Sequence, residues 1–306
     1  MWRDVDPRQP DRDRPDVGRG AADSDAGDRG PSDPRDVFAR DLALPHGPDR
    51  ERVHAHGRVY ELRGAEVRTM ATVGAFRVVP EADLRDAERR PRDLRHLREL
   101  GLVETRPYVV GKTRTRLVTL TPRARNVLER ARRDPRAASA QAFYAGVTKP
   151  RELAHDAQLY RAYVRTADRL VERGGRVRRV VLEEDLKRAY QRFLQTSNRR
   201  RRDSDGRPDR TADEIAQWAR AQQLPMDGDH VQFPDLRIEY DARDGQRAIE
   251  DVEVTTPHYR GAHAAAKARS GFTRYRATGA RLGGGSGSSR SGGRGFDPRV
   301  AEEFLE

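Results

Sequence analysis

The chain has 306 residues, a length typical of about two domains, and its 61 basic residues exceed its 49 acidic residues to give a formal charge of +12. Charged residues make up 36% and hydrophobic residues 35%, so we expect part of the chain to lie outside any packed core. The absence of cysteine excludes disulfides, cysteine zinc sites and thiol catalysis. The sequence has neither a long apolar run nor an apolar leader, so we expect a cytoplasmic protein that does not enter a membrane.

The two ends of the chain have the composition of disordered segments. Residues 1–57 are rich in Asp, Arg, Pro and Gly and lack apolar periodicity, which predicts a disordered arm with one short docking turn around Phe38 and Leu42. Residues 278–295 are rich in Gly and Ser and are typical of a flexible linker. A short amphipathic helix is expected over residues 296–306.

Positive charge is concentrated in the middle of the chain. The net charge is −3 over residues 1–57, +8 over 58–135, +8 over 136–205 and −1 over 206–306. A basic block between neutral or acidic ends suits binding to a polyanion such as nucleic acid. The alternative interpretation is an arginine-rich surface that only faces solvent.

A first structured block is predicted over residues 58–135. Apolar spacing, proline positions and turn residues indicate helices over 67–76, from Pro80 and over 92–100, a hairpin of strands 103–110 and 114–120, and a last helix that begins after Thr121-Pro122. In the third helix the apolar positions Leu94 and Leu97 face inward, and Gly101 ends it. Three helices followed by a β-hairpin predict a small α+β domain.

A second structured block is predicted over residues 150–277. The expected order is a helix from Pro150 to Val171, a strand over 177–182, a helix over 184–194, a helix after the capping box Thr211–Glu214, strands over 230–240 and 247–254 joined by Asp244-Gly245, and a helix over 262–275. This alternation of helices and strands predicts an α/β domain.

Residues 93–104, Asp-Leu-Arg-His-Leu-Arg-Glu-Leu-Gly-Leu-Val-Glu, resemble the recognition helix and first wing strand of MarR-like winged helix-turn-helix domains. The resemblance implies that the third helix enters the major groove of double-stranded DNA and that the wing contacts phosphate or the minor groove. Arginine can grip phosphate or bind guanine in a bidentate manner. The candidate DNA-contacting residues are Arg89, Arg90, Arg92, Arg95, His96, Lys112, Arg114 and Arg116. The alternative is a platform for protein docking or for a homodimer.

Phe233-Pro234-Asp235 and the later run Ile249–Thr255 resemble the PD-(D/E)xK nuclease-like fold, which is related to restriction endonucleases. In particular they resemble the domain that is fused to winged helices in the replication-relaxation family of mobile-element proteins. The resemblance implies that Asp235 and Glu253 hold a divalent metal, Mg²⁺ or Mn²⁺, and that a lysine orients or activates the attacking water. Phosphodiester cleavage needs such a metal to stabilise charge on the phosphate.

The match to the nuclease pattern is partial. Thr255 stands where the family has its lysine. Some members carry that lysine on a helix, so Lys267 becomes the third catalytic candidate beside Asp235 and Glu253. Without a cation, two neighbouring carboxylates repel, and one of them is expected to take up a proton more readily.

Further residues of the second block resemble positions of the same family. His155-Asp156 resembles an early histidine of the family, and Tyr275 a tyrosine near the end of the last helix. His258 and Tyr259 have no clear counterpart in the family pattern.

These observations leave three functions open. The first is a DNA-binding protein in plasmid or mobile-element replication or mobilisation, whose nuclease-like domain binds without cutting. The second is an active metal-dependent DNA endonuclease, and the third is a winged-helix transcription regulator whose second domain dimerises or senses a ligand. A plain structural role stays open as well, in which Asp235 caps a turn and Glu253 is solvated.

Overall fold

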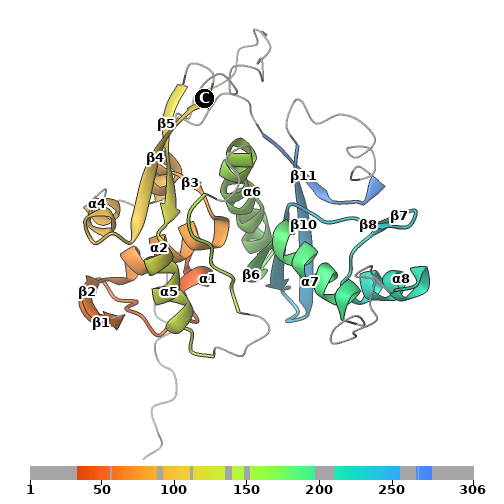
Figure 1. Ribbon diagram of the computed structural model, residues 1–306, viewed down its shortest axis with the longest axis horizontal. Coiled ribbons are helices and arrows are strands. Elements are labelled where there is room, and N and C mark those ends of the chain that lie inside the picture. The colour runs from red at the N-terminus through yellow and green to blue at the C-terminus, as the bar shows by residue number, and fades with distance from the viewer. Residues whose placement is uncertain are drawn as a thin grey trace, which may run out of the picture. The chain divides into compact units, whose positions relative to one another are not determined.

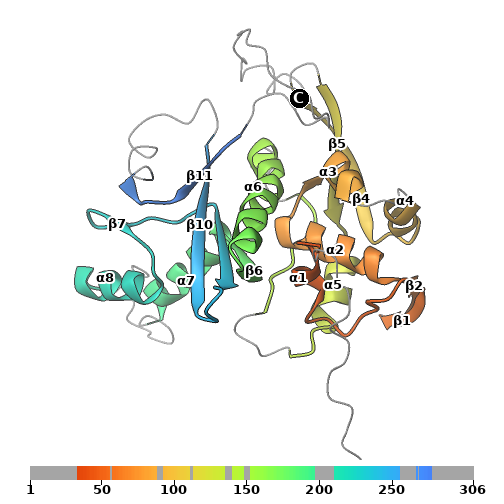
Figure 2. The ribbon, with the colours of Figure 1, turned by 180° about the vertical axis from the view of Figure 1, so that it is seen from behind.

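The computed structural model describes residues 33–55, 57–87, 92–110, 113–134, 140–147, 152–196, 210–255, 267 and 269–277. Within these ranges the protein is a mixed α/β structure that contains four small sheets (Figures 1 and 2). Most of the predicted disordered arm, the predicted linker and the predicted C-terminal helix lie outside the described residues, as do Arg89, Arg90, Lys112, His258 and Tyr259.

The segment from residue 33 to 55 corrects one prediction, because it is ordered and partly buried rather than part of a disordered arm. It contains helix α1 (Asp36–Ala39) and strand β1 (Glu51–Ala55), which pairs antiparallel with β2 (Arg58–Leu62). The ring of Phe38 packs against those of Phe76 and Tyr163, with centroids 5.4 and 5.2 Å away. These partners are distant in the chain, so local composition does not predict the ordering.

The first block has the predicted order of elements. They are α2 (Gly64–Phe76), β3 (Val79–Pro80), α3 (Glu81–Ala87), α4 (Arg92–Glu99), β4 (Val103–Val110), β5 (Thr113–Leu120) and α5 (Pro122–Arg130). The strands form an antiparallel sheet in the order β3-β5-β4. Gly101, with φ of 65°, follows α4, and the Thr121 hydroxyl accepts a hydrogen bond from the Ala124 amide to cap α5.

The second block is built around a four-stranded sheet in the order β11-β10-β9-β6. Its elements are α6 (Leu153–Glu172), β6 (Arg176–Leu182), α7 (Glu183–Gln195), α8 (Ala212–Ala221), β7 (Met226–Asp227), β8 (His230–Val231), β9 (Leu236–Asp241), β10 (Arg247–Thr255) and β11 (Thr273–Arg276). β9 lies antiparallel to both β6 and β10, whereas β11 lies parallel to β10.

Two elements of the second block differ from the prediction. The single strand expected over 230–240 is divided into β8 and β9, since Pro234 between them has no amide hydrogen to donate to a strand ladder. The helix expected over 262–275 does not extend to its predicted end. Gly271 has φ of 77°, and residues 273–276 form β11, so Tyr275 lies on a strand beside Val254.

Helix α6 connects the two blocks through a shared core. It contacts β3 and α2 of the first block and β6, β9 and β10 of the second, as Figures 1 and 2 show. One continuous cluster of buried residues includes Met70 and Phe76 of α2, Tyr163 of α6 and Ile238 of β9. Helix α6 therefore packs against elements of both blocks.

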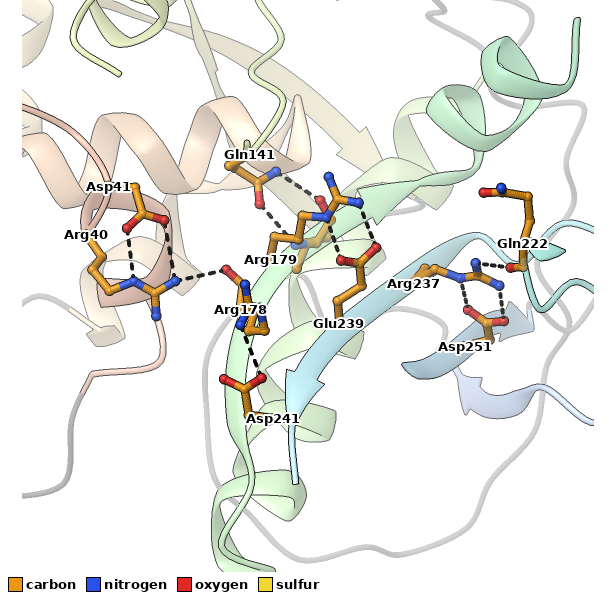
Figure 3. A network of polar contacts seen from close by, with 11 residues as sticks. Arg40, Asp41, Gln141, Arg178, Arg179, Gln222, Arg237, Glu239, Asp241 and Asp251 are labelled. Atoms are coloured by element: carbon orange, nitrogen blue, oxygen red, sulfur yellow. Dashed lines mark hydrogen bonds and ion pairs between the residues drawn. The ribbon is translucent and has the colours of Figure 1, made fainter. Parts of the chain in front are cut away.

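Strand β6 is the edge of the four-stranded sheet, and side chains cover part of its backbone (Figure 3). The Gln141 amide accepts a hydrogen bond from the Val180 N–H and donates one to the Val180 carbonyl, both at 3.0 Å. Arg40 donates to the Arg178 carbonyl at 3.4 Å. These contacts satisfy backbone groups that an edge strand otherwise leaves open to pairing.

Arginine–carboxylate pairs cross the strands of the same sheet (Figure 3). Arg179 of β6 pairs with Glu239 of β9 at 2.7 Å, and Arg237 of β9 pairs with Asp251 of β10, also at 2.7 Å.

None of the described helices is long and apolar enough to cross a membrane.

Candidate functional site

Asp235 and Glu253 meet at one end of the second sheet. Asp235 directly precedes β9, and the antiparallel register that pairs Leu236 with Val252 brings Glu253 level with Asp235. Both residues are buried, with exposed fractions of 6% and 3%. Burying two carboxylates costs free energy unless cations or hydrogen-bond donors compensate their charge, so their partners decide what the site can do.

Lys267 supplies a cation between the two carboxylates. Its Nζ lies 3.2 Å from Asp235 Oδ1 and 2.9 Å from Glu253 Oε2, and the lysine is itself buried. The structure therefore brings together the three residues that the nuclease resemblance selected. By contrast, the hydroxyl of Thr255 donates to the Tyr275 carbonyl at 3.3 Å, so this side chain links β10 to β11.

His155, on the first turn of α6, contacts the other oxygen of Asp235. Its Nε2 lies 3.2 Å from Asp235 Oδ2, and its Nδ1 lies 3.6 Å from Asp156 Oδ1. The Val254 amide also donates to Asp235 Oδ2, at 2.8 Å. Asp235 thus has three partners, one from a helix, one from a strand and one from Lys267.

The pKa values of the centre follow from these contacts, in which Lys267 and His155 supply the positive charge that the expectation of easier proton uptake assumed to be missing. Burial alone would raise the pKa of Asp235, but His155, Lys267 and the Val254 amide outweigh it and lower the pKa below its usual value. Burial would lower the pKa of Lys267, yet the neighbouring carboxylates raise it. Likewise, contacts with Asp156 and Asp235 overcome burial and raise the pKa of His155 to about 10. Asp235 is therefore ionised and both cations are protonated at neutral pH.

Two residues near the acidic centre, Glu183 and Arg77, are absent from the sequence-based prediction. Glu183, the first residue of α7, donates its amide hydrogen to the Asp235 carbonyl at 3.2 Å, and its Oε1 lies 3.7 Å from Lys267 Nζ. Arg77, which follows α2, is buried beside Asp156 at 3.9 Å. A signal for Glu183 existed, because it directly follows a predicted strand, but only the order of the strands places that strand beside Asp235.

A cleft of about 440 Å³ opens beside Asp235 and His155. Its lining comes from the start of α6, from the end of β6 and from one face of α7. Asp235 therefore borders a cavity in the size range of small-ligand sites.

The donor set fits a hard divalent cation of the Mg²⁺ type. Two carboxylate oxygens, one from the residue before β9 and one from β10, already lie within 3.2 Å of one cationic atom, Lys267 Nζ. Among the described residues no group of three or more His, Asp or Glu side chains is arranged to hold a metal. Mg²⁺ needs no such group, since it is commonly held by one or two carboxylates and keeps several waters.

On α4, the exposed residues include Arg92, Arg95 and Arg98, whereas Leu94 and Leu97 are buried. Arg95 forms an exposed ion pair with Glu99 at 2.8 Å. His96 differs from the expectation that it faces DNA together with these arginines.

The Nδ1 atom of His96 instead lies 2.8 Å from Glu66, a fully buried carboxylate of α2 that also pairs with Arg50. A buried charge needs partners, which explains why His96 is engaged between α2 and α4.

On the hairpin, Arg114 and Arg116 of β5 are both exposed. Their positions in the antiparallel register, opposite Val109 and Pro107, place them on the same side of the strand. Two cations separated by one residue along an exposed hairpin suit contact with successive phosphates.

No protein-family model, no curated protein and no solved structure matches the chain. The case for a function therefore rests on the residues of the two candidate sites and on their geometry.

Proposed function

We propose that the protein binds double-stranded DNA and is a metal-dependent nuclease that hydrolyses a phosphodiester bond at Asp235, Glu253 and Lys267. The observation that carries this proposal is the position of Lys267 Nζ between the two carboxylates, 3.2 and 2.9 Å from their oxygens. The proposal includes a winged helix over residues 58–135 and a PD-(D/E)xK-like domain over residues 150–277. As in the family that it resembles, its DNA would belong to plasmids or other mobile elements.

Each residue of the centre has a definite chemical part in this proposal. Asp235 and Glu253 would hold Mg²⁺ or Mn²⁺, which supplies charge stabilisation at the phosphate and a more acidic bound water. Lys267 keeps its proton beside both carboxylates and offers a buried positive charge to the phosphate. Hydrolysis adds water across one P–O ester bond and leaves one phosphate end and one hydroxyl end.

The exposed cations of the first block support the duplex-binding part of the proposal. Arg92 and Arg95 lie on the exposed face of α4, and Arg114 and Arg116 lie on the hairpin. A helix of this size fits the major groove, where arginine can bind the edge of guanine, while hairpin arginines contact phosphates. Helix contacts would then contribute sequence preference, and hairpin contacts would contribute general affinity.

A DNA-binding protein that does not cut is the second candidate, and one observation favours it. Asp235 accepts hydrogen bonds on Oδ1 from Lys267 and on Oδ2 from the Val254 amide, with His155 3.2 Å from Oδ2. A carboxylate with this many partners can be stable without any metal. In that case the centre would stabilise the fold while the first block binds DNA.

Nicking of supercoiled plasmid by the full chain in Mn²⁺ tests the first candidate. We expect Asp235→Asn and Lys267→Gln to abolish nicking and Arg220→Gln, which removes a positive charge from an exposed position on α8, to retain it. In parallel, Mn²⁺ should raise the melting temperature of the wild type but not of Asp235→Asn. A melting shift without nicking would refute the cleavage but keep the metal centre. The absence of both effects would overturn the metal centre and favour the non-cutting candidate.

Mobility-shift titrations of the full chain over a range of salt concentrations test duplex binding. Arg92→Ala and Arg95→Ala should reduce the preference among DNA sequences, whereas Arg114→Ala should weaken binding to all sequences alike and reduce the salt slope by about 1. Arg220→Ala, an exposed change on α8, serves as the control. Duplex binding that is absent, or that salt does not weaken, would refute this part of the proposal.

A further inference from the structure

One face of α7 lines the cleft beside the acidic centre. The residues that share this face are Glu184, Lys187, Arg188, Gln191 and Arg192, whose spacing of three and four residues forms a single helical stripe. The opposite face packs through Tyr190 and Phe193 against Trp218 of α8, with ring centroids 5.1 and 5.5 Å away. The packing fixes the rotation of the helix, so its basic side chains are held along the wall of the cleft.

These basic side chains are available to a ligand. The side chains of Lys187 and Arg188 are 53% and 57% exposed. Among the described residues their ion-pair partners are carboxylates of the same helix: Glu183 for Lys187, and Glu184 and Asp185 for Arg188. Exposed pairs of this kind contribute little to stability, so a phosphate can replace them. The guanidinium of Arg192 forms no ion pair with any described residue.

The size of the cleft limits the substrate. A volume of about 440 Å³ is typical of a site for a small molecule, and it suits one or two nucleotides. A DNA duplex is much wider, since its major groove alone measures about 12 Å. Enzymes that modify a base inside a narrow pocket act on single strands or on nucleotides taken out of the duplex, and the same steric limit applies to a DNA backbone that must enter this cleft.

We propose that this cleft holds an unpaired DNA strand, whose phosphates contact Lys187, Arg188 and Arg192 and whose scissile bond lies at Asp235. The inference rests on the proposed nuclease function and narrows its substrate to single-stranded DNA or to a duplex with an unpaired segment. Arginines of α4 and the hairpin would hold adjoining duplex, while α7 holds the strand to be cut.

The cleft lined by Lys187, Arg188 and Arg192 is called the strand site below. Fluorescence anisotropy in EDTA tests it by measuring how the full chain binds a fluorescein-labelled single-stranded DNA hexanucleotide. We expect the double variant Lys187→Gln/Arg192→Gln to weaken binding roughly tenfold and to reduce the salt slope by about 1.4, because each phosphate contact on a single strand contributes about 0.7. Arg220→Gln/Arg247→Gln removes the same charge from exposed positions outside the cleft and should leave both quantities unchanged. Thermal unfolding confirms that each variant is folded.

The outcomes separate the strand site from the proposed cleavage. Equal weakening by both double variants, or no weakening by the α7 variant, would overturn the strand site even if Asp235→Asn still abolishes plasmid nicking. If strand binding depends on Lys187 and Arg192 but the protein never nicks DNA, the strand site is supported and the proposed cleavage is refuted. If both hold, DNA with an unpaired flap should be cut faster than fully paired DNA of the same sequence.

Discussion

Replacing Lys267 by Met removes the cation between Asp235 and Glu253 while keeping a side chain of similar length. In the wild type, the lysine Nζ lies 3.2 and 2.9 Å from the two carboxylates and 3.7 Å from Glu183. The side chains of the lysine and its two nearest partners are only 4–7% exposed, so water cannot take over the role of the ammonium group. Two buried carboxylates would then face each other without the positive charge that separates them.

The expected loss of unfolding free energy in Lys267→Met follows from the cost of breaking a buried ion pair. Loss of one partner leaves an uncompensated buried charge and typically lowers the free energy of unfolding by about 3–5 kcal/mol. Acid should reduce this loss, because carboxylates that share a site raise each other's pKa and one of them can become protonated. Mn²⁺ bound between the two carboxylates should stabilise the variant by about 2.7 kcal/mol at a concentration one hundred times its Kd.

Urea unfolding at pH 8 and pH 5, with EDTA or with Mn²⁺, measures these effects. Lys187→Met is the matched control. The Lys187 side chain is 53% exposed and pairs with Glu183 within one helix, so its loss should cost no more than about 0.5 kcal/mol. The reasoning fails if Lys267→Met costs less than about 1 kcal/mol, if acid leaves its deficit unchanged, or if Mn²⁺ does not stabilise the variant.

Three further changes test local features of the structure. Gly64→Ala should lower stability by about 1–3 kcal/mol in thermal unfolding, because its Cβ would lie 2.1 Å from the His46 carbonyl oxygen, whereas Gly47→Ala, with no atom within 4 Å, should change little. His155 has a pKa raised to about 10 in the folded state, so its stabilising contribution is complete below about pH 6.5 and is lost as the pH rises to 10. The stability advantage of the wild type over His155→Gln in EDTA should therefore decline over that range by roughly 1–2 kcal/mol after allowance for partial exposure, and a constant advantage would contradict the raised pKa. Thr211→Ala should cost about 1 kcal/mol by removing the cap of α8, and an unchanged urea midpoint would show that the cap is dispensable.

Features that depend on near neighbours in the chain were predicted well. Thr121 caps α5, Thr211 and Glu214 form the capping box of α8, and Gly245 occupies the turn between β9 and β10 with φ of 80°. The hairpin register of those two strands also predicted that Asp235 and Glu253 would be close. In each case the relevant interaction spans about 20 residues or fewer, so the sequence pattern contains the information.

Features that depend on distant parts of the chain were missed. The ordering of residues 33–55 needs Phe76 and Tyr163, and the strand over 273–276 needs β10 as its parallel partner. The periodicity of α4 alone places His96 on the DNA-facing side, whereas Glu66, which engages it, lies on another helix, α2. Glu183 was missed for a similar reason, since its place beside Asp235 follows from β6 lying next to β9.

The amide of Gln141 has a consequence for attempts to divide the chain into fragments. A fragment that begins near residue 150 retains the second sheet but loses Gln141 and Arg40, whose side chains hydrogen-bond to the backbone of β6. The Val180 N–H and carbonyl would then be open to strands of neighbouring molecules, and such edges promote aggregation. A longer fragment that begins at residue 33 keeps both residues, so it should stay in solution where the shorter fragment precipitates.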